Sequence, residues 1–79
     1  YSLMNGMAEA AEFKVLPDFK HLNIPLKTLK IKNNFIIAGI IRNRKAIIPS
    51  GDDVLLNGDH VIVIAEGKHI YTLSDIIAE

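Results

Sequence analysis

The stretch FIIAGIIRNRKAIIPSGDDVLLNGDHVIVI, residues 35–64, decides the fold of this 79-residue chain. It contains apolar, β-branched runs separated by short polar segments, a pattern that predicts antiparallel strands over 35–42, 45–48 and 60–66. If Asn43 and Arg44 form a two-residue turn, Arg42 pairs with Lys45, Ile40 pairs with Ile47, and Ala38 opposes Pro49. The centre of the chain is therefore predicted to be a small antiparallel sheet.

Both faces of the 35–48 hairpin are predicted to be apolar. Strict alternation along the strands places one group of side chains on the first face: Ile36, Ala38, Ile40 and Ile47. It places a second group on the other face: Phe35, Ile37, Ile41, Ala46 and Ile48. Antiparallel sheets usually leave one face to water, and a short chain can cover only one. We therefore expect a second copy of the chain to cover the remaining face, in a homodimer.

Residues 1–16 are predicted to contain a helix followed by a strand. Apolar residues at helical spacing over 1–12 indicate the end of a helix that connects to a larger protein, or else an added or frayed terminus. Residues 12–16 are predicted to form the first strand, which Pro17 ends. We expect 1–10 to be the end of a connecting segment and 11–79 to be one domain.

Two further helices are predicted, over 25–30 and 68–78. Pro25 begins the first, with Leu26 and Leu29 facing inward. The second carries one apolar stripe, which consists of Ile70, Leu73, Ile76 and Ile77. Residues 54–56 are expected to be a short extended piece between turns at 50–53 and 57–58. The expected fold class is α+β, a small antiparallel sheet with two helices in the order β-α-β-β-β-α.

Composition excludes several classes of protein. The chain has no cysteine, which excludes disulfides and thiolate zinc sites. Its net charge is zero, which argues against a nucleic-acid partner. Its longest apolar run extends only from Phe35 to Ile41, far short of the roughly 20 residues that span a bilayer. Because no signal sequence is present either, we expect a cytosolic location.

Residue patterns for catalysis or metal binding are also missing. The three histidines, His21, His60 and His69, lack the short spacing of helical metal sites. Asp52, Asp53 and Asp59 lack the spacing of a calcium loop, and an aspartate after glycine is common in turns. No serine lies in a nucleophile motif. We expect no catalytic residue, no metal ligand, no cofactor and no enzymatic activity.

The hairpin tip, Arg42, Asn43, Arg44 and Lys45, places positive charge beside apolar residues. The apolar neighbours are Ile36, Ile37, Ile48 and Pro49. One interpretation is a solvated turn whose charges protect a sheet edge. The other is an anion-binding corner beside an apolar floor, suited to a phosphorylated base. The residues alone leave both interpretations open.

An ordered set of short motifs resembles the TrkA C-terminal domain, also called RCK_C, from about Ala11 to Ala78. The motifs are Ile41-Arg42, Ile48-Pro49, Gly51-Asp52 and Gly58-Asp59. The segment 25–29 resembles the short first helix of that family. Two segments depart from the family pattern. Asn43-Arg44 replaces its usual glycine-containing hairpin tip, and Asn23-Ile24-Pro25 replaces a glycine-lysine pair.

The resemblance implies a regulatory domain of a cytosolic gating subunit in a potassium-uptake system. Such a domain dimerises and acts, through the full-length protein, on a membrane-embedded potassium transporter subunit at the inner face of the cell membrane. Cyclic di-AMP is the small-molecule nucleotide ligand that the resemblance implies, bound between two protomers. The implied ligand-binding residues are Ile36, Ile37, Arg42, Asn43, Ile48 and Pro49. Two alternatives stay open: a structural dimerisation domain that binds no ligand, and the same module regulating an antiporter or an anion carrier.

Overall fold

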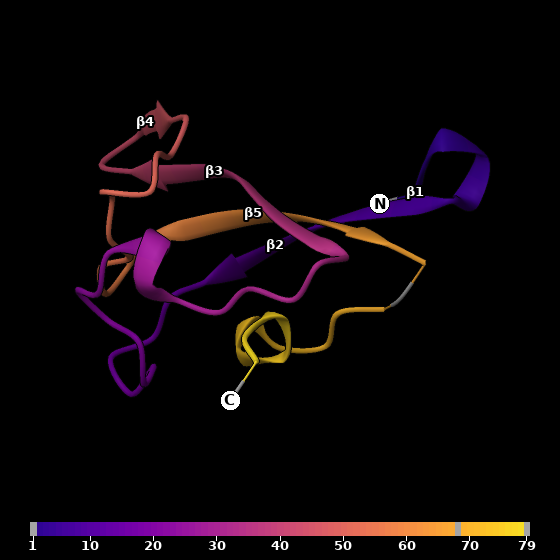
Figure 1. The fold of residues 1–79 in the computed structure, drawn as a ribbon. Coiled ribbons are helices and arrows are strands. Elements are labelled where there is room, and N and C mark those ends of the chain that lie inside the picture. The colour runs from indigo at the N-terminus through magenta and orange to yellow at the C-terminus, as the bar shows by residue number, and fades with distance from the viewer. Residues whose placement is uncertain (1, 68, 79) are drawn as a thin grey trace.

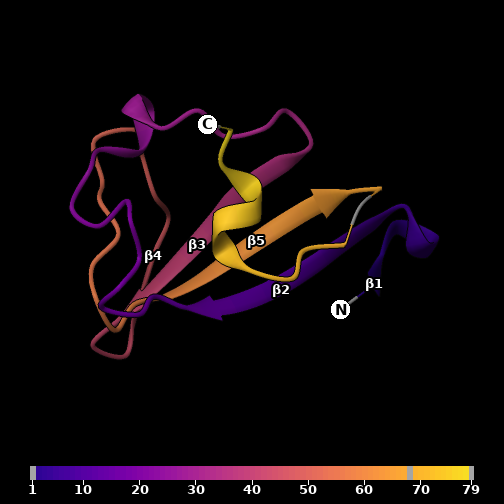
Figure 2. The same ribbon diagram turned by 90° about the horizontal axis from the view of Figure 1, so that it is seen from below.

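The computed structural model describes residues 2–67 and 69–78 and contains one five-stranded antiparallel sheet (Figure 1). Its strands are β1 (Ser2–Leu3), β2 (Ala8–Lys14), β3 (Phe35–Arg42), β4 (Lys45–Ile47) and β5 (His60–Glu66). They lie in the order β1-β2-β5-β3-β4. The segment between β2 and β3 and the chain that follows β5 lie on the same side of this sheet (Figures 1 and 2).

The predicted α+β class, with two helices, was wrong. In the described part of the chain the helical pieces are three short 3-10 turns: η1 (Met4–Gly6), η2 (Leu26–Thr28) and η3 (Leu73–Ile76). Residues 54–56, where a short extended piece was expected, lie outside the strands of the sheet. The fold is therefore a sheet covered on one side by irregular chain.

The helix predicted over 1–12 is replaced by a turn between two strands. Met4, Asn5 and Gly6 have φ values of 53°, 56° and 86°, which reverse the chain so that β1 pairs with β2. β2 then pairs with β5 along its whole length, from Ala8 opposite Glu66 to Lys14 opposite His60. This ladder provides hydrogen-bond partners for the backbone groups of seven residues. Its stabilisation is larger than the weak preference for a helix that the spacing of apolar side chains indicates.

The helix predicted over 68–78 shrinks to η3, and Lys68 lies outside the described residues. Thr72 and Asp75 form a capping box that begins η3. The turn ends at Ile77, which is extended and pairs with Ile31 in an isolated bridge. The predicted apolar stripe does reach the core, since Leu73, Ile76 and Ile77 are buried. Hydrogen bonds to residues 30–32 thus end the helix early.

The hairpin between β3 and β4 was predicted correctly at its turn. Asn43 and Arg44 have φ values of 52° and 64°, as a type I′ turn requires. Arg42 pairs with Lys45, and Ile40 with Ile47. β4 ends at Ile47, so the predicted opposition of Ala38 and Pro49 is not part of the ladder.

The predicted assignment of side chains to the two faces was wrong, because β3 carries a bulge between Ile37 and Gly39. The bulge changes the phase of the alternation. Phe35 and Ile40 are both buried, at 7% and 1% exposure, although strict alternation puts them on opposite faces. Ile36 and Ile41 are 61% and 37% exposed. An extra residue in the strand therefore lets β3 present both Phe35 and Ile40 to one core.

The core lies on the covered side of the sheet. Val61, Val63 and Ala65 of β5 are fully buried there, against residues of the connecting segments that include Val15, Leu26, Leu55 and Ile76. The opposite side carries isoleucines of β3 and β5 that are exposed or only half-buried: Ile36, Ile41, Ile62 and Ile64. We call this side the open face.

Gly51 is constrained by close packing against Lys27. Its φ does not lie in the left-handed region, so an unusual turn conformation is not the constraint. A Cβ atom at Gly51 would instead lie 2.9 Å from the Cβ of Lys27, and Lys27 N donates to Gly51 O at 2.9 Å. The absence of a side chain allows the segments at 27 and 51 to touch.

Gly51→Val is predicted to lower the free energy of unfolding by about 1–3 kcal/mol, because the new side chain overpacks this contact. Urea unfolding monitored by circular dichroism measures the change, with Ser50→Ala as the control for an exposed neighbour. A Gly51→Val variant as stable as the parent would show that the two segments are free to separate.

Candidate ligand-binding groove

A groove of about 430 Å³ lies beside the start of β3, between η2 and the loop that follows β4. Its apolar floor includes Phe35 and Leu26, which are 7% and 9% exposed, and Ile36, which is 61% exposed. The lining residues are Leu26, Lys27, Ile31, Lys32, Asn33, Phe35, Ile36, Ile37, Pro49, Ser50 and Gly51. The groove therefore brings together three of the predicted site residues, Ile36, Ile37 and Pro49.

The ionisable residues that line the groove are lysines. Lys27 and Lys32 both line it, and no aspartate or glutamate is among its described lining residues. Lys27 Nζ lies 2.6 Å from Asp52 Oδ1, in a pair whose side chains are 63% and 81% exposed. An exposed ion pair of this kind contributes little to folding stability, so Lys27 can exchange Asp52 for another anion at low cost. An apolar floor with cationic edges suits a ligand that carries a flat apolar ring and an anionic group.

Arg42 lies elsewhere. It ends β3, six residues after Ile36, which corresponds to about 20 Å along an extended strand. Its Nε donates to Asp59 Oδ1 at 2.8 Å, and its Nη2 donates to Asp59 Oδ2 at 2.7 Å and to Val54 O at 2.9 Å. The guanidinium of Arg42 thus already holds a carboxylate in bidentate geometry.

Asp59 is 2% exposed and also accepts a hydrogen bond from Leu56 N at 2.8 Å. The hydrogen bond from Arg42 lowers the pKa of Asp59, against desolvation by burial, which acts to raise it. The same hydrogen bond raises the pKa of Arg42. The sequence interpretation treated Asp59 as an ordinary turn residue, although Gly58-Asp59 and Ile41-Arg42 were both among the motifs singled out.

The six predicted site residues do not form one cavity within a single chain. Ile36, Ile37 and Pro49 line the groove, whereas Arg42 and the exposed Asn43 lie at the hairpin end. Ile48 is 85% exposed and does not line the groove. The ligand site as a whole stays a prediction. Sequence reasoning did not single out Lys27 or Lys32: Lys32 lies beside β3 because it precedes the strand by three residues, whereas Lys27 lies there through its contact with Gly51.

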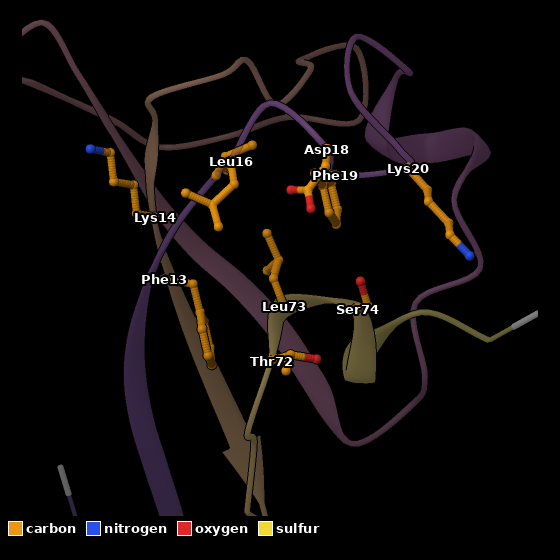
Figure 3. A pocket seen from close by; sticks show the side chains of 10 residues that line it. Phe13, Lys14, Leu16, Asp18, Phe19, Lys20, Thr72, Leu73 and Ser74 are labelled. Atoms are coloured by element: carbon orange, nitrogen blue, oxygen red, sulfur yellow. The ribbon is translucent and has the colours of Figure 1, made fainter.

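A second cavity of about 430 Å³ lies between the end of β2, the loop that follows it and η3 (Figure 3). Leu16 and Leu73 point into it, whereas the ammonium groups of Lys14 and Lys20 point away from its centre (Figure 3). Asp18 also lines this cavity. Its charges are mixed, so it selects for no anion, and the groove beside β3 is the better candidate site.

The described residues hold no group of three or more histidine, cysteine, aspartate or glutamate side chains that could bind a metal ion. His60 Nδ1 lies 2.9 Å from Glu12 Oε2, and His69 Nδ1 lies 3.0 Å from Glu9 Oε1, both in exposed pairs. Among the residues that the structure describes, no helix is long and apolar enough to cross a membrane.

Arg42→Ala is predicted to lower the free energy of unfolding by about 3–5 kcal/mol, because it leaves the buried Asp59 carboxylate without its partner. Urea unfolding measures this loss, with Arg44→Ala at the exposed turn as the control.

The ionised Asp59 carboxylate stabilises the folded state, because its pKa is lower in the folded chain than in the unfolded chain. This stabilisation is complete above the pKa of the unfolded chain, about 3.9, and is lost as the pH falls through the lower pKa of the folded chain. The stability difference between the parent and Asp59→Asn should therefore fade below about pH 4, and a pH-independent difference would contradict the bridge.

Comparison with known proteins identifies the family. The model of the TrkA-C domain matches residues 10–78. A Trk system potassium uptake protein TrkA homolog of Archaeoglobus fulgidus is 32% identical over 71 residues, which are 90% of this chain and 16% of that protein. TrkA homolog 2 of Methanosarcina mazei is 27% identical over 71 residues, with the same coverage of 90% and 16%. The chain thus spans only a small part of the curated relatives it matches.

A solved structure described as "Structure of RCK domain with cda" superposes with a TM-score of 0.64 at 34% sequence identity. The superposition covers 73% of this chain and 81% of the other. The family match extends over nearly the whole chain, and its limits agree with the resemblance from about Ala11 to Ala78. This chain therefore belongs to the TrkA-C domain family.

Proposed function

We propose that this chain is the regulatory domain of a potassium-uptake gating protein and that it binds a cyclic dinucleotide, cyclic di-AMP, as a homodimer. Two findings support the proposal: the curated relatives are Trk potassium uptake proteins, and an RCK domain at 34% identity was solved with cda, an abbreviation that fits cyclic di-AMP. In the full-length protein the domain acts in the cytoplasm, on a membrane-embedded potassium transporter subunit.

The observation that carries the ligand proposal is the groove beside β3. Its apolar floor of Ile36, Ile37 and Pro49 suits the flat face of a purine, and its lysines suit a phosphate. In a dimer, two such grooves related by a two-fold axis match a ligand that is itself two-fold symmetric. The predicted contacts of Arg42 and Asn43 would then come from the hairpin end of a second protomer, and that of Ile48 from the loop that follows β4.

The open face supports the dimer. Ile36 is 61% exposed, and Ile41, Ile62 and Ile64 are only partly covered. Contiguous apolar side chains on one side of a small sheet mark an interaction surface. In a two-fold dimer, a second copy of the same face would bury the open faces of both chains at once.

Regulation requires the ligand to favour one arrangement of the dimer over another. A ligand that contacts both protomers achieves this through different contacts in the two arrangements, and the difference in binding free energy sets how far the equilibrium shifts. The domain supplies the ligand contacts and the dimer interface, and the rest of the protein transmits the change.

A structural dimerisation domain without a ligand is the second candidate. The Arg42 guanidinium favours it, since this side chain is held by Asp59 and Val54 rather than directed toward the groove. The two candidates make the same prediction for the dimer and opposite predictions for the ligand.

Cyclic di-AMP is predicted to bind the parent chain saturably at tens of micromolar or below, with measurable heat in titration calorimetry. Binding to the folded dimer should also raise its stability, by about 2.7 kcal/mol at 100 times the dissociation constant, and thereby its melting temperature. Cyclic di-GMP serves as the control for base recognition. The absence of both heat and a thermal shift would leave the structural candidate as the better one.

The chain is predicted to sediment as a dimer at micromolar concentration. Ile41→Asp, at a position 37% exposed on the open face, should give a folded monomer, because it places a charge in the interface. Ile40→Asp is the matched contrast: Ile40 is 1% exposed in the core, and this variant should unfold. A parent chain that stays monomeric across the micromolar range would exclude the dimer.

A further inference from the structure

We infer that the free edge of β2 pairs with the same edge of a second copy of this chain, in a two-fold contact centred on Phe13. In the sheet order, β5 separates β2 from β3, so this contact lies away from the groove beside β3. It also uses the border of the sheet and not the open face. The contact is therefore a second interaction surface, beyond the proposed function.

Most of the outer edge of β2 has no neighbouring strand. β1 pairs with β2 only at Ala8 and Glu9, whereas β5 pairs with it along its whole length. Figure 2 shows β2 at the border of the sheet, with β1 beside one end of it. The part of β2 that leads to Lys14 is therefore open to another extended strand.

The backbone groups of Glu12 and Lys14 point to this free edge. Val15 N donates to Asp59 O at 2.8 Å, and Val15 O accepts from Gly58 N at 2.8 Å, so Val15 directs both of its groups toward the chain that enters β5. Successive residues of a strand direct these groups to opposite sides. Among residues 2–67 and 69–78, no hydrogen bond to the backbone of Glu12 or Lys14 is found on the outer side.

The sequence of this edge is self-complementary. Residues 12–14 read Glu-Phe-Lys. In an antiparallel pair centred on Phe13, each Glu12 lies opposite the Lys14 of the second copy. Charged side chains on a sheet edge usually prevent pairing. In this register they favour it, because opposite charges face each other across the strands at both pairs.

The same register satisfies the backbone. Glu12 and the Lys14 of the second copy form a hydrogen-bonded pair, since both residues direct N–H and C=O to the edge. The two Phe13 residues form the non-hydrogen-bonded pair between them, in which opposing side chains come closest. Phe13 is half-buried and packs against the core from the covered side of the sheet. Pairing thus adds an aromatic contact to the border of the core.

The side chains of the edge are available to a second copy. Lys14 is exposed, and none of the salt bridges in the described part of the chain includes it. Glu12 Oε2 lies 2.9 Å from His60 Nδ1, in a pair whose side chains are 53% and 42% exposed. This contact orients the carboxylate and leaves its Oε1 for the ammonium group of the second copy.

The length of the free edge limits the strength of the contact. β1 covers one end, and Pro17, which has no N–H group, follows the strand at the other. A contact of a few residues from each copy belongs to the small, weak class of interface. We therefore expect it to form at hundreds of micromolar and to join open-face dimers into larger assemblies.

The first test is sedimentation of the Ile41→Asp variant, whose open face is blocked, between about 10 µM and 1 mM. This variant should be a monomer at the lower end and a reversible dimer toward the upper end. Adding Lys14→Glu should weaken the dimer at least about tenfold, because like charges then face each other, and further adding Glu12→Lys should restore it. Lys30→Glu is the control, since it makes the same change of net charge at an exposed lysine outside β2. It should stay within about twofold.

The second test is disulfide crosslinking in the otherwise unchanged chain, which has no cysteine of its own. An equimolar mixture of Glu12→Cys and Lys14→Cys should crosslink, because Cα atoms of a hydrogen-bonded pair lie about 5.5 Å apart. Each variant alone should crosslink at least about tenfold more slowly, since identical positions are displaced along the strands beyond the roughly 7 Å that a disulfide allows. This test needs no charge reversal and no change to the open face.

Three results would overturn the inference. The first is an Ile41→Asp variant that is folded and still monomeric at 1 mM. The second is an equal loss of association in Lys14→Glu and Lys30→Glu, which would indicate a general effect of net charge. The third is equal crosslinking rates in the mixture and in the single cysteine variants. Each of these results would leave the proposed ligand and the open-face dimer unaffected, because neither involves the edge of β2.

Discussion

The ion pair between Arg42 and Asp59 is the interaction on which the arrangement of the loops depends. Asp59 is almost fully buried, and its carboxylate accepts from Arg42 and from Leu56 N. Its backbone carbonyl accepts from Val15 N at 2.8 Å, so the end of β2 is tied to the same point. Arg42 in turn holds Val54 O. A buried carboxylate is strongly unfavourable unless its hydrogen bonds are all formed. The hydrogen bonds of Asp59 therefore hold the end of β2, the end of β3 and the start of β5 close to one another.

The bulge in β3 decides which side chains are left for other molecules. Because the phase changes between Ile37 and Gly39, Phe35 and Ile40 both enter the core, and Ile36 and Ile41 both face outward. A regular strand would divide the large residues between the two faces and give neither a dense core. The irregular strand produces a closed side and an open side, and the groove forms where the closed side meets the start of β3.

The parts of the fold that were predicted correctly are those whose cause is local. The turn at Asn43 and Arg44 was predicted from its position between two apolar runs, and it forms as expected. β3 and β5 also have the expected bounds. The helices were wrong because their ends are set by distant residues: β5 pairs with β2, and Ile31 pairs with Ile77. Contacts between distant segments also explain why the candidate site was predicted only in part. Ile36, Ile37 and Pro49 were expected together, whereas Lys27 lies beside the groove because its backbone N–H bonds to Gly51 O, a contact between segments far apart in the sequence.

Ile36 connects the groove to the open face, and this position gives the proposed regulation a physical basis. The side chain lines the groove, is 61% exposed, and lies opposite Ile64 of β5 on the uncovered side of the sheet. A second protomer that covers the open face therefore changes the surroundings of the groove floor. In the proposed dimer, a ligand resting on that floor would contact a different surface in each arrangement of the two protomers, which is the condition for a ligand to shift the equilibrium between them.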